Sequence, residues 1–226
     1  MASEKARLKP QGPSLVIQPP RRVAHYQPLE PRSLEAAALL AQGRLSARSF
    51  AECQAEALSL VEMELNQIGL SQARLARLEL LDCEITATDF SNSDLSRASV
   101  TRCLIQQCKF VGADARQAVF RDVVFRQCNL SLAQLGLARF QQVSFEDCRL
   151  QEVDFSGARF KQVRFKNCDL GGLDLSETTH QQLDLRGSRI EGFRAGPEKL
   201  KGLIVDPEQA LSLIHLLGVK VHEAEI

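Results

Sequence analysis

Three segments of this 226-residue chain decide its fold: AVFRDVVFRQCNL (residues 118–130), ARFQQVSFEDCRL (138–150) and ARFKQVRFKNCDL (158–170). They are near copies that begin twenty residues apart. Within each copy a large apolar residue recurs at every fifth position, and Ala or Cys often lies two positions before it. An internal repeat of this kind decides the fold before any local pattern of helix or strand is considered.

The five-residue period extends far beyond these copies. Of the 27 positions at this spacing from residue 60 to residue 190, 25 hold Leu, Ile, Val or Phe, and only Ala115 and His180 depart. A period of five fits neither the 3.6 residues of a helix turn nor the alternation of a simple strand, so a helix is excluded. Because twenty residues are four fives, the sequence predicts a four-sided coil whose successive turns stack like residue on like residue.

The pattern resembles that of the pentapeptide-repeat family, A-(D/N)-L-x-x, which appears here as Ser93-Asp94-Leu95 and Cys168-Asp169-Leu170. The resemblance covers roughly residues 45–195. It implies an all-β fold, a right-handed quadrilateral parallel β-helix of about seven coils, with the large and the small residue of each five pointing inward. Stability then comes from the stacking of neighbouring coils, as in other solenoids.

The flanking sequences divide the chain into four parts. Residues 1–32 are Pro-rich and predict an extended arm. Residues 33–44 predict an N-terminal capping helix that starts at Ser33 and stops at Gly43. The repeat then occupies residues 45–205, and residues 206–226 predict a helix and a last short strand, with Asp206 as N-cap and Pro207 in the first turn.

The apolar residues of the C-terminal helix cover an arc of roughly 220°, wider than the stripe of about 100° that one buried contact needs. We therefore expect one flank, with Ala210, Leu211 and Ile214, to cap the last coil and the other to meet a second copy of the chain. The ending LLGVKV also resembles the C-terminal end of the gyrase-protecting members, which implies a symmetric homodimer. The candidate dimer residues are Leu213, Ile214, Leu216 and Leu217.

No group of residues predicts catalysis, a metal site or a cofactor. All seven cysteines occupy the small inward position, and zinc spacing of the C-x2-C kind is absent. An odd number of cysteines without a secretory signal indicates free thiols and a cytoplasmic protein. His180 replaces a large inward residue, and the sequence leaves open whether it is a structural residue or a functional one. We therefore expect the protein not to be an enzyme.

The charges are balanced, with 28 Lys and Arg against 28 Asp and Glu, and no segment approaches the length of a membrane span. This balance argues against direct binding of nucleic acid. The middle coils nevertheless place apolar and basic residues at outward positions, which indicates a surface for a protein partner. The candidate surface residues are Leu104, Val124, Leu132, Leu137, Arg159, Lys161, Arg164 and Lys166.

Two functions fit these observations. The first is a protein-interaction or scaffolding role for a rigid rod. The second, implied by the resemblance, is a DNA-mimicking protein that binds DNA gyrase or topoisomerase and modulates or protects it. Mimicry needs a continuous negative stripe, whereas residues 56–195 contain 17 basic and 19 acidic residues. The sequence therefore favours the scaffold, without identifying its partner.

Overall fold

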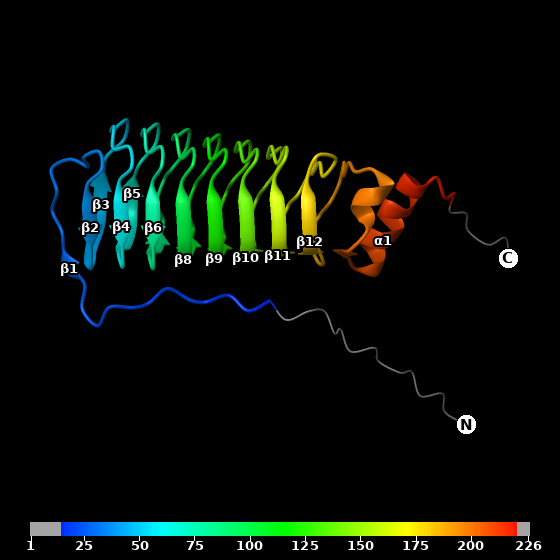
Figure 1. The fold of residues 1–226 in the computed structure, drawn as a ribbon, viewed down its shortest axis with the longest axis horizontal. Coiled ribbons are helices and arrows are strands. Elements are labelled where there is room, and N and C mark those ends of the chain that lie inside the picture. The colour runs from blue at the N-terminus through cyan, green and yellow to red at the C-terminus, as the bar shows by residue number, and fades with distance from the viewer. Residues whose placement is uncertain (1–14, 221–226) are drawn as a thin grey trace, which may run out of the picture.

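The computed structural model describes residues 15–220, and its strands stack into a rod with a helical cap at the C-terminal end (Figure 1). In chain order the elements are β1 (Gln27–Pro28), β2 (Leu39–Ala41), β3 (Gly43–Ser49), β4 (Ser59–Val61), β5 (Glu64–Gly69), β6 (Glu79–Leu81), β7 (Glu84–Thr86), β8 (Ser99–Gln106), β9 (Val119–Arg126), β10 (Arg139–Glu146), β11 (Arg159–Lys166), β12 (Thr179–Asp184), η1 (Pro197–Leu200), β13 (Leu203–Ile204), α1 (Pro207–Leu213) and η2 (Ile214–Leu217).

From β2 onward each strand pairs in parallel with the strand twenty residues further along the chain, so one turn of the coil forms one rung of the rod. The predicted parallel quadrilateral β-helix is confirmed. One column of paired residues has nine rungs, more than the seven expected: Arg44, Glu64, Glu84, Leu104, Val124, Ser144, Arg164, Asp184 and Ile204. Eight spacings of about 4.8 Å make this column about 38 Å long.

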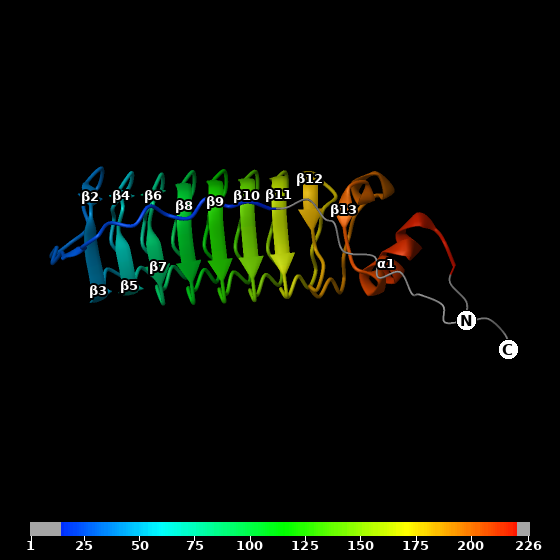
Figure 2. The same cartoon turned by 90° about the horizontal axis from the view of Figure 1, so that it is seen from below.

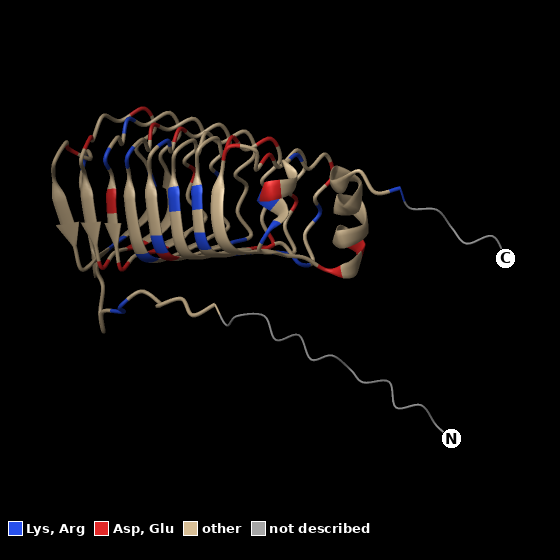
Figure 3. Ribbon diagram, turned by 45° about the vertical axis from the view of Figure 1, so that its right-hand side comes forward, with Lys and Arg blue, Asp and Glu red and all other residues tan. Residues whose placement is uncertain are grey.

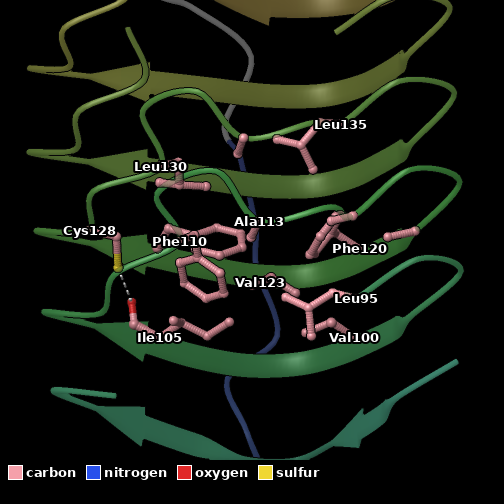
Figure 4. Packing of buried hydrophobic residues seen from close by; sticks show 14 of the residues in the cluster. Leu95, Val100, Ile105, Phe110, Ala113, Phe120, Val123, Cys128, Leu130 and Leu135 are labelled. Carbon is pink, nitrogen blue, oxygen red and sulfur yellow. Dashed lines mark hydrogen bonds between the residues drawn. The ribbon is translucent and has the colours of Figure 1, made fainter. Parts of the chain in front are cut away.

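The core fills the inside of the coil, because the large residue of each five points inward (Figure 4). Phe125, Phe145 and Phe165 form a column of nearly parallel rings whose centroids are 4.8 Å apart. Phe120, Phe140 and Phe160 form a second column at 5.0 and 5.2 Å. Rings from the two columns meet edge to face, as in the Phe140–Phe145 pair. The large slot is therefore a continuous apolar stack, which explains the excess of Phe over Tyr and Trp.

The four corners of each turn have a left-handed backbone conformation, which the five-residue period alone does not predict. Almost every fifth residue from Ala37 to Gly192 has a positive φ, and most of these residues are not glycine. At these corners the backbone N–H bonds to the carbonyl of the next rung, as when Gln72 donates to Ser91 at 2.9 Å and Gln127 to Glu146 at 2.8 Å. The left-handed conformation costs roughly 1 kcal/mol for a residue with a side chain. It persists because the ladder of hydrogen bonds between rungs satisfies each corner.

The N-terminal end corrects the predicted capping helix over residues 33–44. These residues contribute β2 and the start of β3, and Leu40 and Leu45 pair with Leu60 and Leu65. Helix propensity is a weak preference, and it is overridden here by pairing with the next rung and by burial of Leu45 in the core. The exposed edge is instead covered by β1, which pairs in parallel with β3.

The predicted arm is extended in the part that the structure describes, and residues 1–14 lie outside that part. From β1 the arm runs back along the side of the rod and crosses successive rungs from the N-terminal toward the C-terminal end (Figure 2). Backbone groups of the arm bond to side chains on the rungs: the Gln18 N–H donates to Asp122 Oδ1 at 3.1 Å, and the Arg21 N–H to Asp82 Oδ1 at 3.0 Å. The arm is therefore packed on the solenoid.

At the C-terminal end α1 begins as the sequence predicts. Asp206 caps it and forms a capping box with Gln209, and Pro207 lies in the first turn. The Asp206 carboxylate also accepts the Gly187 N–H at 2.9 Å, and the Gln209 amide donates to the carbonyls of Leu185 and Ser188, both at 2.6 Å. These bonds attach the cap to the last full turn. The strand expected near Val221 falls largely outside the described residues.

Candidate functional site

The cysteines belong to the interior of the coil. Six of the seven are buried and Cys53 is half-buried, all with free thiols. The Cys128 thiol donates to the carbonyl of Ile105 at 3.5 Å (Figure 4), and Cys148 and Cys168 repeat this contact one and two rungs further on. Hydrogen bonding to Cys108, together with burial, raises the pKa of Cys128 to about 12. A thiol that stays protonated at neutral pH is a poor nucleophile and a poor metal ligand.

The aspartates that precede the large slot stabilise turns. Asp94, Asp154 and Asp174 each accept the backbone N–H of the residue two positions on, at 2.8 to 2.9 Å. Asp114 accepts the Arg116 N–H and also pairs with its guanidinium. Within residues 15–220 no group of three or more His, Cys, Asp or Glu could hold a metal ion. These carboxylates are thus occupied by local backbone and ion-pair contacts.

His180 lies where the aromatic column ends. It pairs with Phe160 across the rungs and is half-buried. Its Nε2 lies 2.7 Å from the carbonyl oxygen of Lys199, while Nδ1 is buried without a partner among the described residues. The Lys199 ammonium in turn donates to the Thr178 carbonyl at 2.8 Å. His180 therefore ties the turn that closes the rod, which is a structural position.

The predicted partner residues lie on separate sides of the rod. Leu104 and Val124 are neighbours in one column and are half-buried. Arg164 belongs to the same column, two rungs further on, and pairs with Asp184 at 3.3 Å. This is the side along which the arm runs, since Asp122 and Gln142 bond to Gln18 and Val16 there. Lys166 is exposed at the end of β11, and its strand neighbour is Glu146.

A second predicted group lies at and beside a corner of the coil. Leu132 and Leu137 both have positive φ and are 50% and 58% exposed, which is unusual for leucine. Leu137 lies against Gly157 of the next rung: a Cβ added to Gly157 would approach the Leu137 Cδ2 to 2.6 Å. Leu137 lies two residues before Arg139, the first residue of β10. It therefore forms an apolar edge on the side that carries the first residues of β10 and β11.

That side is strongly basic. Arg139 and Arg159 are paired neighbours on β10 and β11, and Lys161 follows two residues later on β11. Arg121 on β9 lies in the same column as Lys161, with Gln141 between them. All four are exposed, and none has an ion-pair partner among residues 15–220. In Figure 3, where Lys and Arg are blue and Asp and Glu are red, blue bands lie on neighbouring strands of the rod and a red band lies nearer the N-terminal end.

We call this group the basic face: Arg121, Leu137, Arg139, Arg159 and Lys161. The sequence predicted Leu137, Arg159 and Lys161 but missed Arg121 and Arg139. The twenty-residue period, applied to charged residues as well as to apolar ones, would have placed Arg139 beside Arg159. Exposed arginines on neighbouring strands, next to an exposed leucine, form the kind of surface that carries binding energy at protein interfaces.

The C-terminal helix faces the rod with the opposite flank to the one expected. Leu213 is buried in the core and Leu216 packs partly against it, so Leu213 belongs to the cap and its assignment to a dimer interface is wrong. Leu211, expected in the cap, is 63% exposed, and Leu217 is 55% exposed. Gln209 fixes this orientation, because its amide donates hydrogen bonds to two carbonyls of the last turn. The flank of the helix that carries Gln209 and Leu213 therefore faces the rod.

Comparisons with known proteins agree with the fold. Residues 98–175 match a family model described as pentapeptide repeat region. A solved structure of trypsin-treated QnrB1, described as a plasmid-mediated fluoroquinolone resistance protein, is similar with a TM-score of 0.57 and 18% identity. The match covers 85% of this chain and 94% of that one. HetL, a pentapeptide repeat protein from the cyanobacterium Nostoc sp. strain PCC 7120, matches at a TM-score of 0.40 and 17% identity, covering 75% and 90% of the two chains.

No curated protein sequence matches this chain. At 18% identity, the likeness to QnrB1 concerns the fold alone. Between residues 15 and 220, none of the helices has the length and apolar character that crossing a membrane requires. The matched segment lies within the stack of β8 to β11, where the paired registers are unbroken. Residues 98–175 therefore match the pentapeptide-repeat model within a regular parallel β-helix, which confirms the resemblance drawn from the sequence.

Proposed function

We propose that the protein is a non-enzymatic interaction scaffold that binds an acidic surface of a protein partner through the basic face. The observation that carries this proposal is the set of four exposed cations on β9, β10 and β11 without ion pairs among the described residues. Several arginines elsewhere on the rod are paired, as Arg126 is with Glu146 at 2.9 Å and Arg194 with Asp174 at 2.9 Å, whereas the basic face gathers four cations without such pairs on adjacent strands. An unpaired group on a rigid sheet retains its full attraction for a complementary surface.

The rigidity of the rod supports this role. The basic residues project from strands whose neighbours on both sides are paired, so their backbone positions are fixed before a partner binds. Preorganisation lowers the entropy cost of association. Leu137 at the edge adds an apolar contact, and the charged residues around it set the specificity. The reduced thiol column supports a cytoplasmic location, where thiols remain free.

The alternative is that the rod mimics DNA and binds DNA gyrase, as the likeness to the gyrase-protecting members implied. The best acidic column contains Asp94, Asp114, Gln134 and Asp154, and it ends in Asp174 beside Arg194. It is interrupted by a neutral residue, and Arg116 and Arg194 neutralise two of its carboxylates. A phosphate backbone is a continuous row of charges. The charge pattern therefore favours the scaffold over the mimic.

We also propose that the chain forms a homodimer through its C-terminal end. Leu211, Leu217 and Val219 are all exposed there, at 63%, 55% and 46%. They lie at the C-terminal end of the rod and are not part of the flank, with Leu213, that caps the core. Their exposure is the support for a second copy as the partner of this end.

The function is tested by capture of partners from the source cells with the full chain as bait. The double variant Arg139→Glu/Arg159→Glu reverses two charges of the basic face. Arg149→Glu is the matched control, because Arg149 is an exposed arginine of the same rod on another side. We expect one protein to bind the wild type and the control, to be lost with the double variant, and to cross-link to β9–β11. Equal capture by all three proteins would contradict the proposal.

A further inference from the structure

Residues 15–22 of the arm lie along the side of the rod formed by β7 to β11 (Figure 2). Four contacts join them to it. The Gln142 amide donates to the Val16 carbonyl at 2.9 Å, and the Gln18 and Arg21 N–H groups donate to Asp122 and Asp82. The Arg22 guanidinium pairs with Glu84. Three of the four contacts use the backbone of the arm, and the four together span 60 residues of the solenoid, from position 82 to position 142.

The spacing of these contacts matches the spacing of the rungs. Asp82 and Asp122 are forty residues apart in the sequence, which is two rungs, or about 9.6 Å along the rod. Gln18 and Arg21 are three residues apart, and three residues of polyproline II helix span about 9.3 Å. Three residues of an extended proline-rich segment therefore span the same distance as two rungs of the rod.

The two residues between the anchors are Pro19 and Pro20. Proline has no N–H, so no donor is left without an acceptor between Gln18 and Arg21. Prolines also hold the segment in the extended conformation before it binds, which reduces the entropy lost on docking. The sequence Gln-Pro-Pro-Arg thus presents backbone donors only at the two positions where the rod supplies carboxylates.

The rod is built to receive these donors. The Asp82 and Asp122 side chains belong to residues that are only 2% and 5% exposed. Arg102, on the rung between them, holds Asp82 with two hydrogen bonds of 2.7 and 2.6 Å. Burial alone would raise the pKa of Asp82, but Arg102 and the Arg21 N–H outweigh burial and lower it. Leu104 and Val124, each two residues after a corner of this side, are half-buried neighbours in one column.

We propose that this side of the rod is a recognition groove for an extended Gln-Pro-Pro-Arg segment, and that residues 15–22 of the same chain are its occupant. The groove selects backbone donors three residues apart, an extended conformation between them, and a cation that reaches Glu84. Four residues separate Arg22 from β1, which is fixed to β3, so the arm reaches the groove of its own rod. While it is seated, the Asp82 and Asp122 carboxylates are not available to another extended segment.

The first test is limited trypsin digestion of the full chain, followed by mass spectrometry of the new N-termini at Arg22 and Val23. Asp122→Gly removes one anchoring carboxylate and suits the corner, where φ is 54°. Asp147→Gly is the matched control, since Asp147 has a φ of 55° and lies at an exposed corner. We expect cleavage at these bonds to be about tenfold faster in Asp122→Gly than in the control, the effect of one charge-assisted hydrogen bond. Equal rates in proteins of unchanged circular dichroism would overturn the proposal.

The second test uses a fluorescent peptide with the sequence of residues 15–27 and the full-length variant Gln18→Pro/Arg21→Pro. This variant lacks both donors of its own arm and keeps the groove intact. We expect the peptide to bind it with one-to-one stoichiometry, and at least about tenfold more weakly to the wild type, whose tethered arm competes. Adding Asp122→Gly to the variant should remove binding.

Absence of peptide binding to the Gln18→Pro/Arg21→Pro variant would overturn the groove. Light scattering on the same samples tests the assignment to the same chain. The mass of the wild type and of the variant should be equal, because the arm does not join two copies. A mass that falls when the two donors are removed would mean that the arm occupies the groove of a second copy, and would overturn the intramolecular assignment.

Discussion

Phe145 lies between Phe125 and Phe165 in a column of stacked rings and is fully buried. Replacing it by alanine removes contacts on both sides and leaves a cavity that the rigid coil cannot close. We expect Phe145→Ala to lower the free energy of unfolding by about 3–5 kcal/mol. Gln141→Ala, at an outward position of the same strand, should change it by less than about 0.5 kcal/mol. Urea denaturation measures both, and equal losses would contradict the inward and outward assignment.

Ala115 is the one small residue in a large slot whose neighbours across the rungs, Leu95 and Leu135, are both buried leucines. An apolar cavity of about 40 Å³ lies at this place and is lined by all three residues. Ala115→Val should fill part of it and raise the free energy of unfolding by about 1 kcal/mol. The matched change Ala138→Val, at a fully buried small slot that does not line this cavity, should be destabilising because the added methyl groups must displace packed neighbours. A loss of stability in both variants would mean that the cavity is too narrow to accept a side chain.

Asp184 is buried between two arginines, with Arg186 at 2.8 Å and Arg164 at 3.3 Å. Burial alone would raise the pKa of Asp184, but the hydrogen bonds and charge of Arg186, together with the charge of Arg164, lower it. A lowered pKa in the folded state stabilises the fold above the unfolded value of about 4, and this contribution disappears as the pH falls through the folded pKa.

We therefore expect Asp184→Asn to lower the free energy of unfolding by about 2 kcal/mol at neutral pH. The difference from the wild type should shrink as the pH falls below about 4, where the wild-type carboxylate becomes protonated. Asp147→Asn, at an exposed corner, is the control and should follow the wild type throughout. Thermal unfolding measured from neutral to acid pH checks this, and a constant difference would contradict the role given to Asp184.

The direction of most side chains could be predicted from the five-residue period, because large residues such as Phe145 and Leu95 lie where it places them. Two residue-level features could not. The positive φ of corner residues such as Leu137 depends on hydrogen bonds between rungs and leaves no mark in a period of apolar residues. The contact of Gln18 with Asp122 joins positions 104 residues apart, and nothing local in either segment announces it.

The elements at the two ends of the rod show why prediction succeeded at one and failed at the other. At the C-terminal end the start of α1 is determined by residues close together in the sequence: Asp206 and Gln209 form a capping box, and Pro207 lies in the first turn. At the N-terminal end, residues 33–44 favour a helix by composition, yet they continue the pairing of the solenoid because the next rung offers a complete set of hydrogen-bond partners. The capping signal at Asp206 was therefore informative, whereas the cap expected at Ser33 and the helix propensity of the residues after it were overridden by strand pairing.

The orientation of α1 makes a testable distinction between Leu213 and Leu217. Leu213 is 7% exposed and belongs to the core, whereas Leu217 is 55% exposed at the proposed dimer end. Leu213→Asp buries a charge in the cap and should lower the free energy of unfolding by about 3 kcal/mol or more. Leu217→Asp should leave the fold unchanged and halve the mass seen by light scattering. A wild-type protein that is already a monomer would contradict the dimer.

The whole molecule combines a regular interior with an irregular distribution of charge. The arm lies along one side, the basic face occupies another, and aspartates that stabilise turns form an interrupted column. The strict twenty-residue register makes each of these surfaces a straight column, so single substitutions such as Gln134 within the acidic column break a stripe of charge. The same fold can therefore present different surfaces while its core is unchanged.

The central claim is that this solenoid binds a protein through basic residues and does not mimic DNA. DNA gyrase supercoiling of a relaxed plasmid, measured with increasing amounts of the purified full chain, tests it most directly. We predict that neither the supercoiling rate nor its inhibition by a fluoroquinolone changes at a molar excess of the protein. Inhibition of supercoiling, or protection from the drug, that disappears when Asp94, Asp114, Asp154 and Asp174 are replaced by Asn would contradict the claim and establish the acidic column as a DNA mimic.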